Sequence, residues 1–245
     1  MAFQDHFSTQ ARTYAKARPT YPAELFAELA RLAPGHALAW DAGAGNGQAS
    51  VALAAHFEHV IASEPSDAQL AAAMAHPRVE YRRSAELLPG AEDGSVDLVT
   101  VAQAAHWFDR PTFYAEARRV LRPGGVIALW AYELCHISPE IDAAVFRFYK
   151  GPIGPYWPPE RRHTETGYRE FEFPFAEFPF PHHAMEHDWT LANFTAYLRS
   201  WSAVNRYLKE HGRDPVDELE AELAPLWGQG ARRISWPLSG RIGRV

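Results

Sequence analysis

Nine consecutive residues, Trp40-Asp41-Ala42-Gly43-Ala44-Gly45-Asn46-Gly47-Gln48, carry the strongest structural signal in this chain. They follow a short apolar run and precede an alanine-rich run, so they predict a glycine-rich turn between a strand and a helix. Backbone amides at the start of such a helix attract anionic groups, and glycines let a ligand approach the backbone. A dinucleotide fingerprint beginning at Gly43 would require glycine at position 48, which is glutamine. The pattern is instead D-x-G-x-G-x-G.

Up to about residue 130 the chain alternates short apolar runs with helical patterns. Strands are predicted at 37–40, 59–62, 79–82, 96–101 and 126–130. Helices are predicted over 48–57, after a cap at Ser66 or Asp67, and from Pro111 through Val120. This alternation predicts right-handed crossovers and a parallel sheet covered on both faces, so the fold class is α/β.

Composition excludes several classes of protein. The 245 residues include 24 Lys+Arg and 30 Asp+Glu, a net charge of −6, which argues against a nucleic-acid partner. The single cysteine, Cys135, excludes an intrachain disulfide and a multi-cysteine zinc site. The first residues lack the apolar region of a secretory signal, and no run of about 18 apolar residues predicts a membrane span. We therefore expect a cytoplasmic protein with no membrane partner.

The second half of the chain has a different character. Proline and aromatic residues dominate 151–181, a composition that excludes a central strand or a long helix but provides apolar surface for packing. This segment is expected to form a cap on the sheet rather than a separate structural lobe. A helix is predicted over 191–211, another from Asp214-Pro215, and a closing strand in the tail, with a bulge or bend at Gly240.

The glycine pattern resembles motif I of the class I S-adenosylmethionine-dependent methyltransferases, and later motifs agree with it in order. Glu64 lies 23 residues after Asp41, which matches the family's spacing for the acid that binds the cofactor ribose. Ala85-Glu86 resembles the motif at the adenine edge, and residues 103–108 take the position that lines the methionine moiety. Residues 121–125, Leu-Arg-Pro-Gly-Gly, resemble the family's L-x-P-G-G turn.

This resemblance implies a seven-stranded, mostly parallel sheet of order 3-2-1-4-5-7-6, with helices on both faces, an antiparallel last strand and an aromatic, proline-rich cap. Four segments of the same domain are expected: a cofactor-covering segment (1–34), an S-adenosylmethionine-binding core (35–132), a cap (133–190) and closing helices with the last strand (191–245). Tyr14, Arg18-Pro19, Ser200-Trp201 and the last ten residues resemble the small-molecule branch similar to trans-aconitate methyltransferase.

The cofactor site is expected to hold S-adenosylmethionine, with S-adenosylhomocysteine as product. The residues that the resemblance assigns to it are Tyr14, Arg18, Asp41, Ala42, Gly43, Gly45, Gly47, Glu64, Pro65, Ala85, Glu86, Gln103, His106 and Trp107.

Several of these residues have a structural alternative. Asp41 could hold the glycine loop by accepting backbone hydrogen bonds instead of contacting the cofactor ammonium group. His106 is a candidate general base, but it could equally hydrogen-bond the backbone near the cofactor, and Trp107 could belong to the core. His183 and His187 have the H-x-x-x-H spacing of some metal ligands, but the stretch is proline-rich and has no cysteine nearby, so no metal is expected.

The expected activity is methyl transfer to a small acidic or polar molecule, and the alternative is a protein that binds the cofactor without transfer. A carboxylate acceptor would need no base, and an arginine could bind it bidentately. Spacing does not distinguish among four candidate arginines: Arg18, Arg161, Arg162 and Arg206. The acceptor is expected to lie near Trp157, Trp201 and Arg206, although these residues could form a satellite core instead. A nucleic-acid methyltransferase is disfavoured by the net charge and by the absence of an Asn/Asp-Pro-Pro-aromatic tetrapeptide after the fourth strand.

Overall fold

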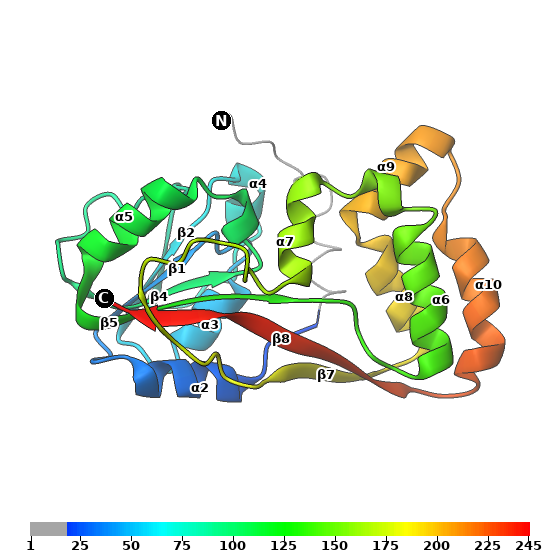
Figure 1. Cartoon of the computed structure of the whole chain (residues 1–245), viewed down its shortest axis with the longest axis horizontal. Helices are drawn as coiled ribbons and strands as arrows, with labels where there is room; N and C mark the ends of the chain where they lie inside the picture. The colour runs from blue at the N-terminus through cyan, green and yellow to red at the C-terminus, as the bar shows by residue number, and fades with distance from the viewer. Residues whose placement is uncertain (1–18) are drawn as a thin grey trace.

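A computed structural model describes residues 19–245 of this chain, whose centre is a twisted, mostly parallel sheet (Figure 1). Its first five strands run parallel in the order β3-β2-β1-β4-β5, and β8 then continues the sheet antiparallel to β5. The strands are β1 (Leu38–Ala42), β2 (His59–Ser63), β3 (Val79–Arg82), β4 (Val96–Ala102), β5 (Leu121–Tyr132), β6 (Ala176–Phe178), β7 (Ala184–Trp189) and β8 (Arg232–Arg244).

Helices cover both faces of this sheet because its central strands are apolar on both sides. Leu98 and Trp130 pack in the cluster that includes α2 (Ala23–Leu32) and α3 (Gln48–Leu53). Their strand neighbours Val99 and Leu129 pack in a second cluster with α5 (Arg110–Val120). A further short helix, α4 (Asp67–Ala71), begins as expected after Ser66, whose side chain accepts a hydrogen bond from the Gln69 amide. The predicted α/β sheet with helices on both faces is confirmed.

Strand β8 connects three other strands and extends the expected topology by one. Its later residues pair with β5 and β6, so the observed order β3-β2-β1-β4-β5-β8-β6 is the expected 3-2-1-4-5-7-6 with β8 as the seventh position. Its earlier residues pair with β7, an additional strand, so the expectation of seven strands was one short. The expected bulge at Gly240 is not there, because the register through Trp130↔Gly240 is unbroken. Gly240 instead lets β8 lie close to β5, because a Cβ added at this position would overlap the Leu129 carbonyl.

Beyond the sheet, four helices form a lobe that Figure 1 shows at the far end of β8. We call α6 (Pro139–Lys150), α8 (Leu191–Arg199), α9 (Ser202–His211) and α10 (Val216–Trp227) the helical lobe. The single helix predicted over 191–211 is two helices, because the chain leaves the helical conformation at Trp201. Helix α10 contacts both α6 and α8, so the lobe combines a helix from the expected cap range with the closing helices.

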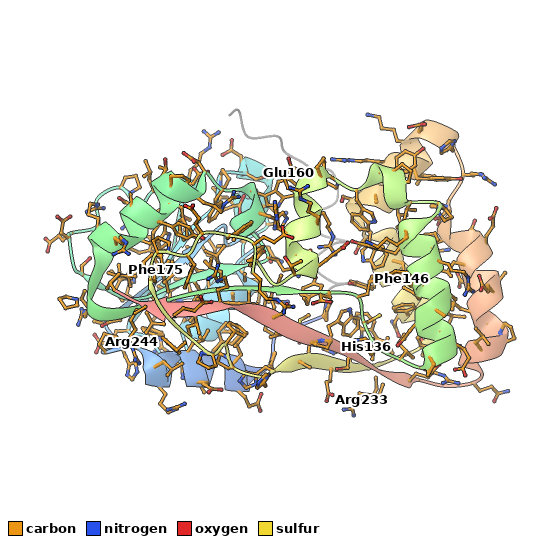
Figure 2. All side chains as sticks on the ribbon, in the orientation of Figure 1. His136, Phe146, Glu160, Phe175, Arg233 and Arg244 are labelled. Carbon is orange, nitrogen blue, oxygen red and sulfur yellow. The ribbon has the colours of Figure 1, made fainter. Side chains whose placement is uncertain are left out.

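The proline- and aromatic-rich segment contains only short elements. They are η3 (Gly154–Tyr156), η4 (Pro159–Arg161), α7 (Arg162–Glu165) and the edge strand β6. This agrees with the expectation that prolines would exclude a central strand or a long helix. Figure 1 shows α7 between the sheet and the helical lobe, and Figure 2 shows Phe175 over the sheet end of the molecule and Phe146 on the lobe. Among residues 19–245, no helix has the length and apolar character needed to cross a membrane.

Candidate active site

A cavity opens at the carboxyl ends of the parallel strands, where open α/β sheets bind their ligands. We call it the strand-end cavity. It contains about 1140 Å³ of empty space, including space open to solvent, which is enough for a small organic ligand. The lining residues are Pro19, Tyr21, Gly43, Ala44, Gly45, Asn46, Gln48, Ala49, Glu64, Pro65, Gln69, Ala85, Glu86, Ala102, Gln103, Ala104, Trp107, Phe108 and Tyr132.

The residues expected to bind the cofactor divide into three groups in the structure. Eight of them line the cavity: Gly43, Gly45, Glu64, Pro65, Ala85, Glu86, Gln103 and Trp107. Four others, Asp41, Ala42, Gly47 and His106, are not among the lining residues. Tyr14 and Arg18 lie outside the described residues.

The glycine loop after β1 lies against the end of β2. The Gly43 and Ala44 amides donate to the Ser63 carbonyl at 2.8 and 3.0 Å. Gly45 has a φ of +57°, and a Cβ added there would meet no protein atom within 4 Å, so it would project into open space. Gly47 has a different role, because a Cβ at that position would overlap the Tyr81 hydroxyl. Gly45 is therefore the glycine whose missing side chain leaves room for a ligand.

Glu64 follows β2 and holds this loop through its carboxylate. One oxygen accepts the Gly45 amide at 2.9 Å, and the other accepts the Ser66 amide at 2.9 Å. Each carboxylate oxygen has two lone pairs, so the group can still accept hydrogen bonds from a ligand in the cavity that it lines. The same side chain is thus suited to position the loop and to bind vicinal hydroxyls.

Asp41 lies beneath the glycine loop and is fully buried. Its two oxygens accept hydrogen bonds from the Ser50 hydroxyl at 2.6 Å and the Thr100 hydroxyl at 2.9 Å. Burial raises the pKa of Asp41 to about 6. The nearby charge of Glu64 acts in the same direction, and the hydrogen bonds from Ser50 and Thr100 oppose it. The Ser50 backbone amide also hydrogen-bonds the carboxylate. These contacts join β1, α3 and β4, which agrees with the structural alternative for Asp41, extended by two hydroxyl donors.

The loop after β4 forms the opposite wall of the cavity. Gln103 has a φ of +59°, and it is held by its amide, which donates to the Trp130 carbonyl, and by its side chain, which donates to the Tyr132 carbonyl. Trp107, in η2 (Ala105–Trp107), lines the cavity. Its neighbour His106 is buried, with Nδ1 3.2 Å from the Tyr168 hydroxyl.

The environment of His106 makes it a weak base. Burial lowers its pKa to about 3, and the positive charge of Arg161 contributes to the same shift. The imidazole is therefore neutral at physiological pH, and it is too weak a base to take a proton from a neutral acceptor. The structure places it between the post-β4 loop and the cap, where Tyr168 rather than a backbone group is its hydrogen-bond partner.

Several lining residues were missed by the sequence analysis. Gln69 is buried in α4 beside Glu64, and the cap signal at Ser66 places that helix without indicating which face meets the cavity. Tyr132 ends β5, a position at which parallel strands commonly present ligand-binding groups. Tyr21 follows Pro19 and packs edge-on against Trp130, 5.7 Å between ring centroids.

The three residues proposed for the acceptor are not on the cavity lining. Trp201 is buried, and its ring lies 5.5 Å from Trp157 and 5.9 Å from Tyr149. Arg206 donates from Nη1 to the Tyr156 carbonyl at 3.1 Å. Trp157 is partly buried and meets η4 as well as the lobe. Trp201 thus has the packing expected of core, whereas Trp157 lies where the cap turns toward the post-β4 loop.

Comparison with known proteins agrees with this geometry. Residues 40–129 match the model of a methyltransferase domain. A Dictyostelium discoideum protein named as a methyltransferase is 37% identical over 225 residues, which cover 90% of this chain and 86% of the relative. The chain belongs to the class I S-adenosylmethionine-dependent methyltransferases. S-adenosylmethionine is therefore its methyl donor, and the expected family and cofactor are confirmed.

Solved structures extend the likeness over almost the whole methyltransferase. A structure from Anaeromyxobacter dehalogenans, named as a type II methyltransferase, is 44% identical with a TM-score of 0.87, and the match covers 93% of this chain and 97% of that one. A methyltransferase from an antibiotic biosynthesis pathway of Anabaena variabilis shares the fold, at 19% identity and a TM-score of 0.54, with 93% and 99% covered.

Substituting Gly45 tests whether the cofactor lies against the glycine loop. Gly45→Val should abolish measurable S-adenosylhomocysteine binding in calorimetry, because its side chain would enter the cavity. The positive φ also costs on the order of 1–3 kcal/mol for a non-glycine residue. Gly90→Val is the matched control, since Gly90 has a φ of +82° and equally open surroundings but does not line the cavity. Equal affinity in the two variants would contradict this placement.

Glu64 should contribute to cofactor affinity through its charge. Glu64→Ala is expected to raise the S-adenosylhomocysteine Kd about tenfold to a hundredfold, the effect of losing charge-assisted hydrogen bonds worth roughly 1.5–3 kcal/mol. Glu64→Gln should have a smaller effect because one carbonyl acceptor remains. Glu58→Ala, an exposed acid before β2, provides the control. If both Glu64 variants bind like the parent, this residue does not bind the cofactor.

The buried carboxyl of Asp41 should make folding stability depend on pH. The pKa of Asp41 in the folded protein, about 6, lies above the ordinary value of 3.8. The stabilisation of the folded state by the protonated carboxyl is therefore fully present below about pH 4 and is lost as pH rises through 6. The shift corresponds to roughly 3 kcal/mol. Relative to the parent, Asp41→Asn should therefore gain up to about 3 kcal/mol in free energy of unfolding between pH 4 and pH 7. Urea denaturation at both pH values measures this, and parallel pH profiles would refute it.

Proposed function

We propose that this methyltransferase transfers the methyl group of S-adenosylmethionine to a small acidic or polar molecule bound between the strand-end cavity and the helical lobe. The observation that supports this most directly is the composition of the cavity. Its lining includes the polar side chains of Glu64, Gln69 and Glu86 as well as the aromatic side chains of Trp107, Phe108 and Tyr132. Polar groups suit the ribose and adenine edges of the cofactor, and aromatic side chains help to exclude water around the reacting methyl group.

The cofactor supplies an activated methyl group, because a sulfonium sulfur is a good leaving group. The protein must bind and align the two reactants, exclude water and remove a proton where the acceptor is neutral. The titratable groups beside the post-β4 loop are poorly suited to remove a proton. Burial lowers the pKa of His106 to about 3 and raises the pKa of the Tyr168 and Tyr149 hydroxyls. An acceptor that is already an anion fits these surroundings best.

Methyl transfer to such an acceptor requires no proton transfer. An oxygen of the acceptor carboxylate forms the new bond to the methyl carbon while the electron pair of the carbon–sulfur bond remains on sulfur. The negative charge of the acceptor and the positive charge of the sulfonium group are both neutralised, giving a methyl ester and S-adenosylhomocysteine. Apolar walls favour this step, because the charge pair disappears as the reaction proceeds.

Turnover with a panel of acceptors tests the proposal. The full-length protein is incubated with S-adenosylmethionine and small mono-, di- and tricarboxylic acids, each paired with its carboxamide. S-adenosylhomocysteine release should occur with at least one acid and not with its carboxamide, and mass spectrometry should detect the methyl ester. Because no base is needed, kcat should vary little between pH 6 and 8. If the protein binds S-adenosylhomocysteine but forms none of it from S-adenosylmethionine with any of the acids, the proposal is refuted and a binding protein without transfer activity is favoured.

A further inference from the structure

Arg161 differs from most arginines of this chain in its surroundings. It is partly buried at the end of η4, and among residues 19–245 no carboxylate pairs with it. Its Nη1 donates to the Thr164 hydroxyl at 2.9 Å, and its Nε is buried without a hydrogen-bond partner. By contrast, Arg199 binds three acids, Asp214, Asp217 and Glu220. Arg161 also hydrogen-bonds the Tyr149 hydroxyl, which donates to the Glu165 carboxylate at 2.7 Å, so an acid reaches the guanidinium only through Tyr149. A partly buried guanidinium with no carboxylate in direct contact is suited to bind an anion of a ligand.

Trp157 adds a second hydrogen-bond donor at the same place. The Arg161 guanidinium lies over its ring, 5.0 Å from the centroid. The indole Nε1 of Trp157 is also buried and has no acceptor within the described part of the chain. Buried donors are normally satisfied. Among residues 19–245 the indole nitrogens of Trp130, Trp227 and Trp236 are also without acceptors, but Trp157 differs from them in having a cation against its ring, so this pair suits a group that carries only acceptors. An ionised carboxylate is such a group.

This pair lies beside the wall of the strand-end cavity. Its turn, η4, contacts η2, in which Trp107 lines the cavity. Tyr168, from the same part of the cap, hydrogen-bonds His106, the residue before Trp107. Figure 2 shows Glu160, the neighbour of Arg161, near α7 and between the sheet and the helical lobe. Neither Arg161 nor Trp157 is a lining residue, so an anion bound by them would lie behind the η2 wall of the cavity, away from Glu64, and a long acceptor would have to pass Trp107 to reach the methyl group.

Neighbouring cations do not offer an equivalent site. Arg162 is exposed, and Lys150 pairs with Glu165 at 3.1 Å. Arg206 donates to a backbone carbonyl of the cap. A single guanidinium matches one planar, singly charged carboxylate, whereas a phosphate dianion would call for more than one cation.

We propose that Arg161 and Trp157 bind a carboxylate of the methyl acceptor and so determine which acceptors this methyltransferase uses. Arg161 binds the two carboxylate oxygens through its planar guanidinium, and the Trp157 indole N–H donates to one of them while its ring holds the guanidinium in place. This proposal rests on the proposed function, because it assigns the acidic acceptor to a particular pair of side chains. It also separates Arg161 from Arg162 and Arg206, the other candidate arginines within the described residues.

Four variants of the full-length protein test this assignment: Arg161→Gln, Arg161→Lys, Trp157→Phe and the control Arg162→Gln. Each is measured with the acid that the parent methylates fastest, and its S-adenosylhomocysteine Kd is measured by calorimetry. Arg161→Gln should lower kcat/KM for the acid about tenfold to a hundredfold, mostly through KM, and leave the cofactor Kd unchanged. Arg161→Lys should fall between it and the parent because the charge remains but bidentate binding is lost. Trp157→Phe retains an aromatic ring under the guanidinium but removes the indole N–H, and it should raise KM severalfold. Arg162→Gln should resemble the parent.

The possible outcomes separate this inference from the proposed function. Unchanged KM for the acid in both Arg161 variants would refute the role of Arg161 and leave acid methylation standing. A parent that releases S-adenosylhomocysteine only with neutral or phosphorylated acceptors would refute both. If Arg161→Gln fails to fold, Arg161→Lys and Trp157→Phe still decide, because each retains most of the packing. Loss of cofactor affinity in these variants would show that the pair belongs to the cofactor site and would refute the acceptor assignment.

Discussion

The active site depends on the hydrogen bonds between the end of β2 and the loop that follows β1. Parallel pairing brings Ala42 opposite Ser63, so the next residues of both strands meet at one edge of the sheet. The Ser63 carbonyl accepts two loop amides, and the Glu64 carboxylate accepts the amide of Gly45. These hydrogen bonds fix the conformation of the glycine loop, so that Gly45 lines the cavity. The residue suited to bind the ribose is also one that positions the loop, so the two functions cannot be altered independently.

The opposite wall is held by residues in an unfavourable backbone conformation. Within residues 19–245, the non-glycine residues with positive φ are Gln103 and Tyr168. Gln103 is constrained by bonds to β5, and Tyr168 is fully buried against Phe171 and bonded to His106. Such conformations persist where the surroundings determine them strongly, and they are concentrated at functional sites. Gln103 lies where the post-β4 loop meets β5, and Tyr168 lies where this loop meets the cap. Together they fix the loop that places Trp107 at the cavity.

The helical lobe explains how a methyltransferase core of common design could acquire a particular acceptor. Strands β5 and β8 lead from the sheet to the lobe, and η4 returns the chain to the post-β4 loop (Figure 1). The loops at the strand ends are suited to bind the cofactor, and the cap brings Arg161, which contacts no carboxylate among residues 19–245, behind the η2 wall of the cavity. Separation of the two tasks between different segments allows the acceptor site to change while the sheet and the cofactor loops remain the same.

Sequence by itself determined the five parallel strands and the glycine loop, and the family resemblance supplied the order of the sheet, but neither predicted β7. Local signals are sufficient there: apolar runs specify the strands, Ser66 begins a helix, and the glycine spacing with Glu64 identifies the family. Only the tertiary structure decided which side chains meet across the cavity. Asp41 is held beneath the loop because the hydroxyls of Thr100 in β4 and Ser50 in α3 donate hydrogen bonds to its carboxylate, and spacing along the chain cannot show a contact between residues 59 positions apart. Likewise, the spacing of Arg161, Arg162 and Arg206 along the chain does not distinguish them, and only packing shows that Arg161 lies over Trp157 with no carboxylate of residues 19–245 in contact, because pairing depends on distance in space.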